Sequence, residues 1–171
     1  MTGAVSITHT GSADVEIDNG TTALNLGTVS VGQNFEARSG NGITDSGVIT
    51  VAGTSLFHSD ITGKVITLDS VNAMTGAVSI THTGSANVAI DNGTTALNLG
   101  TISVGKDFSA TSGGVISDSG VITVVRDATF VTDVDDIDIV LDSNNAITGD
   151  LIFTTQTGGT NGADITFDNG S

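Results

Sequence analysis

The amino-acid sequence predicts an all-β fold in which short parallel strands wind into a β-helix, or β-solenoid, of about seven coils. Two observations lead to this prediction. The chain repeats itself, and Thr, Ser, Gly, Val and Ile dominate each copy. β-Branched residues favour strands over helices. Almost no window has the apolar spacing of three and four residues that an amphipathic helix requires, so helical repeat folds are excluded.

The repeat units follow one another without a spacer. Identical segments recur at one constant offset: 1–13 at 74–86, 17–28 at 90–101, and 46–51 at 119–124. A third copy opens at Ile147 and reaches Gly170 with four extra residues in the loop 157–162. We therefore expect repeat units at 1–73 and 74–146 and a partial unit at 147–171. Together they should form one continuous solenoid, as in a segment of a longer array.

Each repeat unit is too long for one coil, so a shorter period should lie within it. Aspartates that precede turns recur at intervals of about a third of the unit. This spacing predicts about three coils per unit, each with three strands and three corners, and a ladder of stacked corner aspartates. The ladder residues are Asp18, Asp45, Asp69, Asp91, Asp118, Asp142 and Asp168.

Differences between the two full copies show which side chains face inward. Asp14 and Glu16 become Asn and Ala in the second copy, whereas Val15 and Ile17 are kept. Alternate side chains of a strand point to opposite faces, so the unchanged positions should be buried and the variable ones exposed. The same alternation predicts this core: Val5, Ile7, Val15, Ile17, Leu24, Leu26, Phe35, Phe57, Ile66, Leu68, Phe130, Ile139 and Leu141.

The corners should be turns stabilised by their own aspartates. Asp18-Asn-Gly20 and Asp45-Ser-Gly47 are turn sequences, because Gly accepts positive φ and Asx side chains bond to backbone two residues on. Carboxylates stacked about 4.8 Å apart repel by about 1 kcal/mol in water unless each caps a backbone N–H. We expect capping, with calcium binding as the alternative. Neither an EF-hand loop nor a Gly-Gly-x-Gly-x-Asp nonapeptide is present.

The repeated segments resemble those of a known family. Units that read Thr-Gly-Ala-Val-Ser-Ile, Asp-Asn-Gly-Thr-Thr-Ala-Leu-Asn-Leu-Gly-Thr and Ile-Thr-Asp-Ser-Gly-Val-Ile-Thr-Val are similar to the repeats of giant secreted bacterial adhesins, the filamentous-haemagglutinin-like proteins. The resemblance covers nearly the whole chain. It implies a right-handed parallel β-helix that serves as a non-catalytic stalk or filament at the bacterial cell surface.

Composition limits the remaining function classes. The chain lacks cysteine, which excludes disulfides, zinc-thiolate sites and thiol nucleophiles. A net charge of -15 would repel a phosphate backbone, so nucleic acid is a poor partner. No apolar run approaches the roughly 20 residues that a membrane-spanning helix needs. Open strand edges at the two ends of a solenoid favour end-to-end self-association as the partner interaction.

Few residues are candidates for chemistry. His9 and His82 are equivalent in the two copies, and we expect them to face outward. The carboxylates Asp133, Asp135 and Asp136 are the metal candidates, with calcium as the cation, although a solvated acidic segment is the simpler interpretation.

Catalysis requires unlike residues that converge in one groove. Parallel β-helix enzymes that act on polysaccharides pair carboxylates with a basic residue. Here the basic residues are scattered over different coils, so we expect no enzyme and no cofactor; they are Arg38, Lys64, Lys106 and Arg126. An ice-binding solenoid is a further alternative, but Thr-x-Thr occurs only once per three coils at Thr8 and Thr81.

Overall fold

The computed structural model describes residues 1–59, 61–82 and 84–170, and the regular structure in these ranges is β-strand throughout. The strands are β1 (Val5–His9), β2 (Val15–Asp18), β3 (Leu24–Val31), β4 (Phe35–Ser39), β5 (Ile43–Asp45), β6 (Ile49–Val51), β7 (Ser55–Ser59), β8 (Ile66–Leu68), β9 (Ala73–Met74), β10 (Val78–His82), β11 (Val88–Asp91), β12 (Leu97–Val104), β13 (Phe108–Ser112), β14 (Ile116–Asp118), β15 (Ile122–Val124), β16 (Ala128–Asp135), β17 (Ile139–Leu141), β18 (Ala146–Ile147), β19 (Leu151–Gln156) and β20 (Ile165–Phe167). None of these ranges contains a helix that could span a membrane.

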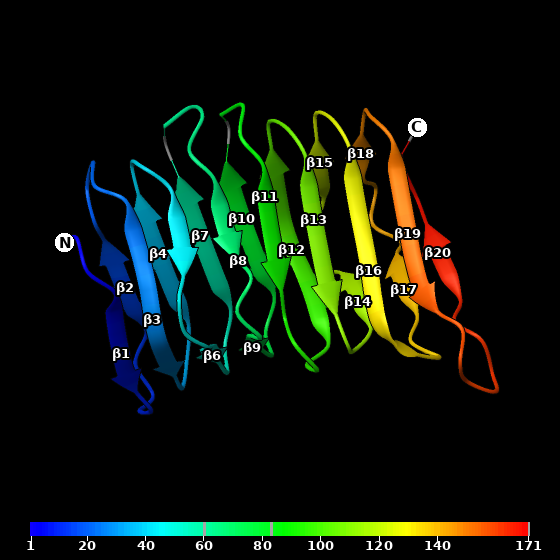
Figure 1. Cartoon of the computed structure of the whole chain (residues 1–171), viewed down its shortest axis with the longest axis horizontal. Coiled ribbons are helices and arrows are strands. Elements are labelled where there is room, and N and C mark those ends of the chain that lie inside the picture. Colours follow the sequence, from blue (N-terminus) through cyan, green and yellow to red (C-terminus); the bar gives the residue numbers. More distant parts are fainter. Residues whose placement is uncertain (60, 83, 171) are drawn as a thin grey trace.

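Parallel pairing stacks the strands along the long axis of the molecule, with the two termini at opposite ends (Figure 1). Side I is the stack β2, β4, β7, β10, β12, β15 and β18. Side II is β3, β5, β8, β11, β13, β16 and β19. Side III is β1, β3, β6 and β9 at the start of the chain and β12, β14, β17 and β20 later.

The chain visits these sides in a fixed cycle, so each coil has three sides. Strands β3 and β12 are longer and each covers two sides, because the register of their pairing shifts where the strand bends. The bend in β3 lies at Gly27, where an added Cβ atom would sit 2.5 Å from Ser6 Oγ of the coil below. The parallel β-solenoid of about seven coils that the sequence predicted is confirmed.

The repeat does not span a whole number of coils. One repeat carries β1 of side III to β10 of side I, and β4 of side I to β13 of side II. Strand pairing links Ile7 to Val29, Val29 to Ile49, and Thr50 to Ala73. Three coils from β1 therefore end at β9, whereas the copy of β1 in the next repeat is β10 on the following side. The sequence predicted about three coils per unit, and the structure shows that one repeat advances three coils and one side, so equivalent residues do not stack in line.

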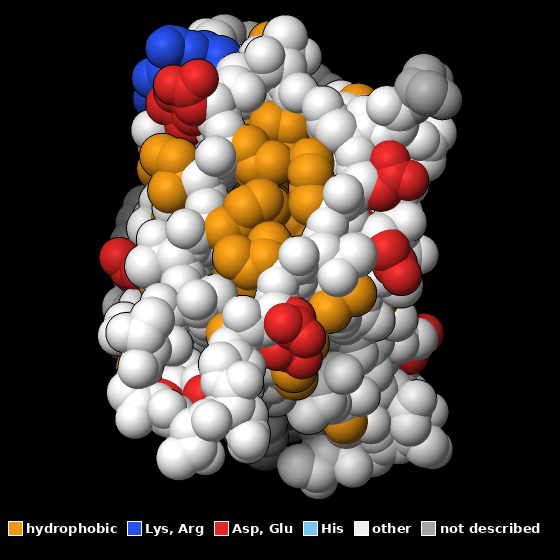
Figure 2. All heavy atoms as spheres, turned by 90° about the vertical axis from the view of Figure 1, so that its right-hand side faces the viewer, with side chains coloured by type: hydrophobic (Ala, Val, Ile, Leu, Met, Phe, Trp, Pro, Cys, Tyr) orange, Lys and Arg blue, Asp and Glu red, His pale blue; other side chains and the backbone are white. Residues whose placement is uncertain are grey.

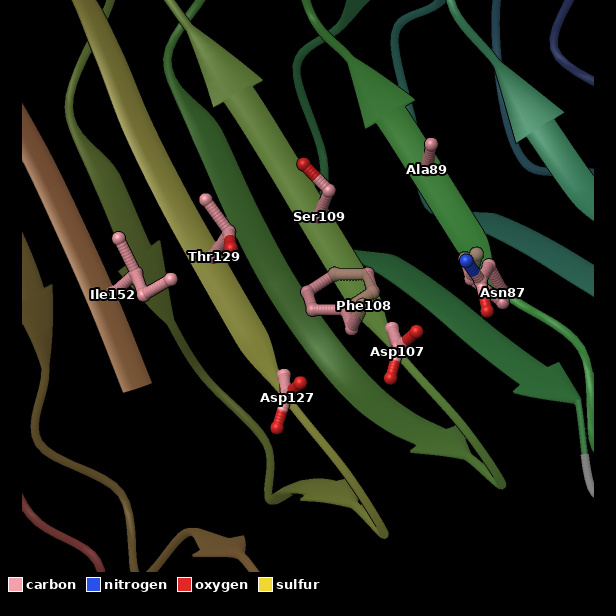
Figure 3. A pocket seen from close by; sticks show the side chains of 9 residues that line it. Asn87, Ala89, Asp107, Phe108, Ser109, Asp127, Thr129 and Ile152 are labelled. Carbon is pink, nitrogen blue, oxygen red and sulfur yellow. The ribbon is translucent and has the colours of Figure 1, made fainter. Parts of the chain in front are cut away.

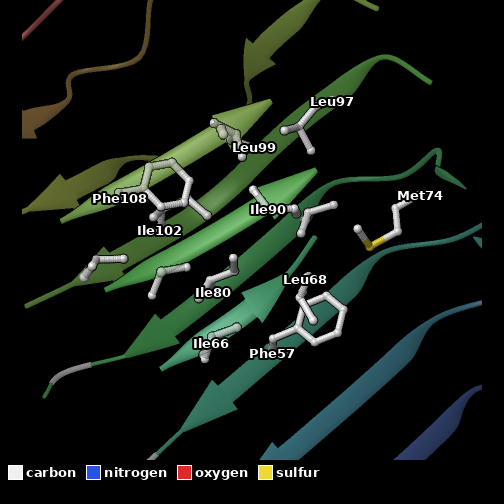
Figure 4. Packing of buried hydrophobic residues seen from close by; sticks show 14 of the residues in the cluster. Phe57, Ile66, Leu68, Met74, Ile80, Ile90, Leu97, Leu99, Ile102 and Phe108 are labelled. Atoms are coloured by element: carbon white, nitrogen blue, oxygen red, sulfur yellow. The ribbon is translucent and has the colours of Figure 1, made fainter. Parts of the chain in front are cut away.

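Inward side chains from all three sides form one core along the rod (Figure 4). Of the predicted core, Leu24, Leu26, Phe35, Phe57, Ile66, Leu68, Phe130, Ile139 and Leu141 are at most 1% exposed. The four residues of the first coil, Val5, Ile7, Val15 and Ile17, are partly buried against the same cluster. They are less buried because, among the described strands, the first coil is covered from one direction only.

Phenylalanine rings form two separate groups of contacts in the core rather than one line. Phe57 lies on side I, with its ring centroid 6.1 Å from that of Phe35. Phe130 lies on side II, 5.9 Å from Phe108 and 5.6 Å from Phe153. Phe57 and Phe130 are equivalent in the repeat, so their separation on two sides follows from the extra side in each period.

Buried asparagines hold the corners of the coils. The amide of Asn92 donates to the carbonyl oxygens of Met74, Thr95 and Ala96 at 3.0, 3.2 and 3.0 Å. Its Oδ1 accepts the backbone N–H of Met74 at 2.9 Å. Asn92 therefore satisfies backbone groups in two successive coils, which a turn residue exposed to solvent could not do.

Candidate functional site

The predicted aspartate ladder is divided among three corners. Asp18 ends β2 on side I; Asp45, Asp69 and Asp91 follow strands of side II; Asp118, Asp142 and Asp168 follow strands of side III. A single ladder through all seven is therefore wrong. The interval from Asp18 to Asp45 is one coil and one side, since the two residues end strands on different sides.

Aspartate carboxylates cap backbone N–H groups in two ways. Asp18, Asp91 and Asp168 accept from the glycine two residues on, Gly20, Gly93 and Gly170, at 2.7 to 2.8 Å. Asp45 and Asp118 accept from the next coil instead. Asp45 Oδ1 accepts the N–H of Asp69 at 3.0 Å, and its Oδ2 accepts the amide of Asn72 at 2.8 Å. These corner oxygens are engaged by protein donors.

Burial raises the pKa of the Asp45 carboxyl above its usual value of 3.8, although the bonds from Asn72, Ser70 and Asp69 act in the opposite direction. Desolvation outweighs these bonds because the carboxylate lies between two coils, away from full hydration. The equivalent carboxylate, Asp118, accepts the amide of Asn145 at 2.7 Å. The two copies therefore use the same aspartate–asparagine pair to join adjacent coils.

The acidic segment around Asp136 supports a loop. Asp136 accepts backbone N–H groups of Thr160, Asn161 and Gly162 at 2.9, 3.3 and 2.9 Å. These bonds, with that from Asn161 the largest cause, lower the pKa of the Asp136 carboxyl. Asp135 accepts the N–H of Gly158 at 2.8 Å. The third metal candidate, Asp133, is exposed.

Asp136 also has a left-handed backbone, with φ of 58°, which places its carboxylate against the loop. Such a backbone is uncommon outside glycine, and aspartate is among the residues that tolerate it best. Among the described residues, no group of three or more His, Asp or Glu side chains is arranged to hold a metal ion.

The histidines differ from expectation. His82 is fully buried, and its Nε2 lies within hydrogen-bonding distance of the Lys64 carbonyl oxygen. His9 is half-buried at the equivalent position of the first coil. The prediction that both face outward is wrong, because each shares strand parity with inward residues such as Ile80. That alternation was visible in the sequence.

The four basic residues lie on different coils, as the sequence indicated. Arg38 pairs with Glu36 on the same strand. Arg126 Nε lies 3.8 Å from Asp107 Oδ1 in the coil below. Lys106 and Arg126 occupy neighbouring coils, since the N–H of Arg126 donates to the Lys106 carbonyl oxygen at 3.3 Å.

A shallow groove of about 320 Å³ lies on side II across β11, β13, β16 and β19 (Figure 3). Its outward side chains are small: Ala89, Ser109 and Thr129 stand in register on three neighbouring strands. The first copy has Glu16, Glu36 and Leu56 at the same repeat positions. This difference in size was visible in the sequence as variation on the outward face. Only the stacking shows that the small residues adjoin one another.

The groove is open to solvent, and its two carboxylates bond other parts of the protein. Asp107 and Asp127 lie at one end of the groove, and Ile152 of β19 lies at its edge (Figure 3). Asp127 Oδ1 accepts the N–H of Asp150, so this carboxylate also caps the next coil. Arg126 is a basic side chain beside the groove, and it forms an ion pair with Asp107.

The C-terminal end of the rod exposes core residues. Figure 2 shows a continuous hydrophobic patch on this end of the molecule. The end coil consists of β19 and β20, in which Leu151, Phe153 and Phe167 are partly buried and Ile165 is 47% exposed. Each of these two strands pairs on one edge only among the described strands. The described strands therefore leave one face of this coil uncovered.

Comparison with known proteins identifies the repeat. A family model for repeats of unknown function, DUF5649, matches residues 12–81 and 85–154. Residue 85 is the repeat equivalent of residue 12, so the two matches follow the period of the internal repeat. Searches of curated proteins and of solved structures gave no match. The chain belongs to the DUF5649 family and carries two tandem copies of its repeat.

Proposed function

We propose that this chain is a structural, non-catalytic rod segment of an extracellular fibre or bacterial surface adhesin. The observation that carries the proposal is the stacking of strands in parallel around a single core, with pairing that runs continuously along sides I and II and in two stretches along side III. Each coil contacts mainly the coils above and below it, as in other solenoid proteins. Such a molecule extends by adding repeats and keeps its cross-section.

The coils are linked in a way that suits a stiff rod. Backbone bonds of the parallel ladders join every adjacent pair of coils, and Asn72 and Asn145 add bonds between coils at the corners. The same pairs recur in both repeats, so each added repeat brings the same connections. A rod of this kind would hold a terminal binding region away from a surface or form the body of a filament.

Other observations support the extracellular and adhesive parts of the proposal. The repeats resemble those of secreted adhesins, and the absence of cysteine suits export of an unfolded chain. A net charge of -15 would keep the sides of such rods apart in solution. Labelling of intact cells with an antibody to the chain tests the location. Signal only after lysis would contradict it.

We also propose that the rod associates end to end and that it requires no cofactor. The end coils carry unpaired strand edges and partly exposed core residues, and such edges pair readily with other strands. The sides of the rod carry outward polar residues and single exposed valines such as Val71 and Val125, and the net charge of -15 opposes contact between sides. Association along the axis is therefore favoured over lateral association.

Tandem arrays of one, two and four DUF5649 repeat pairs test the rod. At about 4.8 Å per coil, three coils and one side correspond to about 16 Å per repeat. We expect the length measured by small-angle scattering to grow by this constant amount for each added repeat. Growth with the square root of repeat number would show flexibly linked units and contradict the proposal.

A further inference from the structure

We propose that the C-terminal coil, β19 and β20, binds the β3–β4 coil of a second copy of this chain. It would take the position that β1 and β2 occupy in the single chain. The inference rests on the proposed function, because it names the partner and the register for end-to-end association. In a longer array, a following repeat of the same chain would provide the equivalent coil.

The end coil is the third occurrence of one coil type. The coil β1–β2, the coil β10–β11 and the coil β19–β20 each close with an asparagine that bonds the residue opening the coil. The pairs are Met1 with Asn19, Met74 with Asn92, and Ile147 with Asn169. The Ile147 N–H donates to Asn169 Oδ1 at 2.8 Å, and Met74 bonds Asn92 in the same way at 2.9 Å.

The first two coils of this type are covered by the same neighbour. Strand β3 pairs with β1 through Val5 and Leu26, and β12 pairs with β10 through the equivalent residues. Strand β4 pairs with β2 through Val15 and Phe35, and β13 pairs with β11 in the same register. The third coil has no such cover among the described strands. The structure therefore shows in both repeats which strands cover a coil of this type.

The end coil offers a larger apolar face than the coil it would replace. Its inward-row residues are Leu151, Phe153, Phe167 and Ile165, the last opposite the buried Ile139, where β1 and β2 have Val5, Ile7, Val15 and Ile17. Every substitution is to a larger apolar side chain. These larger side chains already pack within their own copy, where the Phe153 ring contacts those of Phe130 and Phe167. Burial of more apolar surface favours the exchange.

Charge also favours the exchange. In the single chain, Glu16 of β2 stands directly opposite Glu36 of β4. Like charges opposite each other on adjacent strands are destabilising. In the exchanged arrangement, Thr166 of β20 takes the place of Glu16, because Ile165 and Phe167 correspond to Val15 and Ile17. The repulsion against Glu36 is then removed.

Disulfide trapping between single-cysteine variants tests the register, since the chain has no cysteine of its own. Thr166→Cys is mixed with Glu36→Cys, and separately with Glu16→Cys. Adjacent parallel strands place opposed Cα atoms about 4.8 Å apart, within the disulfide range. We expect the Thr166–Glu36 mixture to form at least tenfold more mixed dimer than the Thr166–Glu16 mixture.

Either of two other results overturns the inference. Predominant trapping with Glu16→Cys would show that intact ends meet without exchange. No dimer in either mixture would show that β20 pairs with neither β4 nor β2 of a second copy, which also overturns the exchange. Neither result affects the rod itself, which is tested separately by the length of tandem arrays.

A matched pair of variants tests the surface without cysteine. Ile165 and Ile152 are 47% and 49% exposed, but Ile165 belongs to the inward row and Ile152 to the outward face of side II. We expect Ile165→Asp to reduce the dimer fraction in ultracentrifugation at least tenfold. Ile152→Asp should change it less than twofold. Equal effects of the two variants would overturn the inference.

Discussion

Phe130 provides a demanding test of the core. Its side chain is fully buried on side II, and its ring lies between those of Phe108 and Phe153 at centroid distances of 5.9 and 5.6 Å. The change Phe130→Ala removes both ring contacts at once. It also leaves a cavity inside a coil whose backbone is fixed by ladders above and below.

The expected cost follows from this burial. Fully buried Phe→Ala changes destabilise proteins by about 3 to 5 kcal/mol, the larger values arising where the surroundings cannot collapse. Backbone pairing of β16 with β13 and β19 restricts collapse here. Each lost aromatic pair contributes about 0.5 to 1.5 kcal/mol. We therefore expect a loss of about 4 to 5 kcal/mol in the free energy of unfolding.

Urea unfolding followed by circular dichroism measures this loss, with Val131→Ala as the matched control on the same strand. Val131 is half-buried on the outward face, so its truncation should cost less than about 1 kcal/mol. If the two variants lose similar stability, the assignment of inward and outward faces on side II is refuted.

Three further predictions concern the corners. Asn92→Ala leaves the N–H and carbonyl of Met74 without partners, so urea unfolding should show a loss of about 2 to 4 kcal/mol; a loss as small as that of the exposed control Asn87→Ala would contradict this. The raised pKa of Asp45 makes its ionisation more costly in the folded state, so its contribution to stability is full below pH 3.8 and declines as pH rises through the raised pKa. The stability of the wild type relative to Asp45→Asn should fall over this interval, and a rise would refute the assignment. Because the carboxylates of Asp18, Asp45, Asp91, Asp118 and Asp168 accept protein N–H groups, calcium and sodium chloride at matched ionic strength should give similar melting temperatures; a large calcium-specific rise would indicate a cation-dependent fibre.

The sequence was sufficient for the fold class and for the inward faces. Two copies that differ at Glu16 and agree at Ile17 reveal the alternation of a strand within a single chain. Phe35 and Leu68 were assigned to the interior by the same comparison, and both are buried. Covariation with other proteins was not needed, because the second repeat served as the comparison.

The number of sides in a repeat could not be read from the same data. Asp18 and Asp45 both precede turns, but one ends a strand of side I and the other a strand of side II. The interval between Asp18 and Asp45 therefore covers one full coil and one further side. Coil lengths also vary, since the step from Val15 to its partner Phe35 is shorter than the step from Ser55 to its partner Val78. An average period conceals such differences.

The contacts of Asn92 and Asp136 depend on stacking as well. The sequence Asp91-Asn-Gly93 predicts a turn, as Asp18-Asn-Gly20 does, but the side chain of Asn92 also bonds Met74 of the coil below. Asp136 bonds a loop that lies about one coil later in the chain. Local sequence gives the turn, but the partner is known only when the register of the next coil is fixed.

The central claim is that the strands stack in parallel with these registers, and engineered disulfides within one chain test it most directly. Ser109 on β13 stands opposite Thr129 on β16. A repeat of three equal coils would instead bring the residue one third of a period later, Asp133, opposite Ser109. We predict that the double variant Ser109→Cys/Thr129→Cys forms an intramolecular disulfide under mild oxidation and that Ser109→Cys/Asp133→Cys does not. The reverse result would contradict the three-sided solenoid described above.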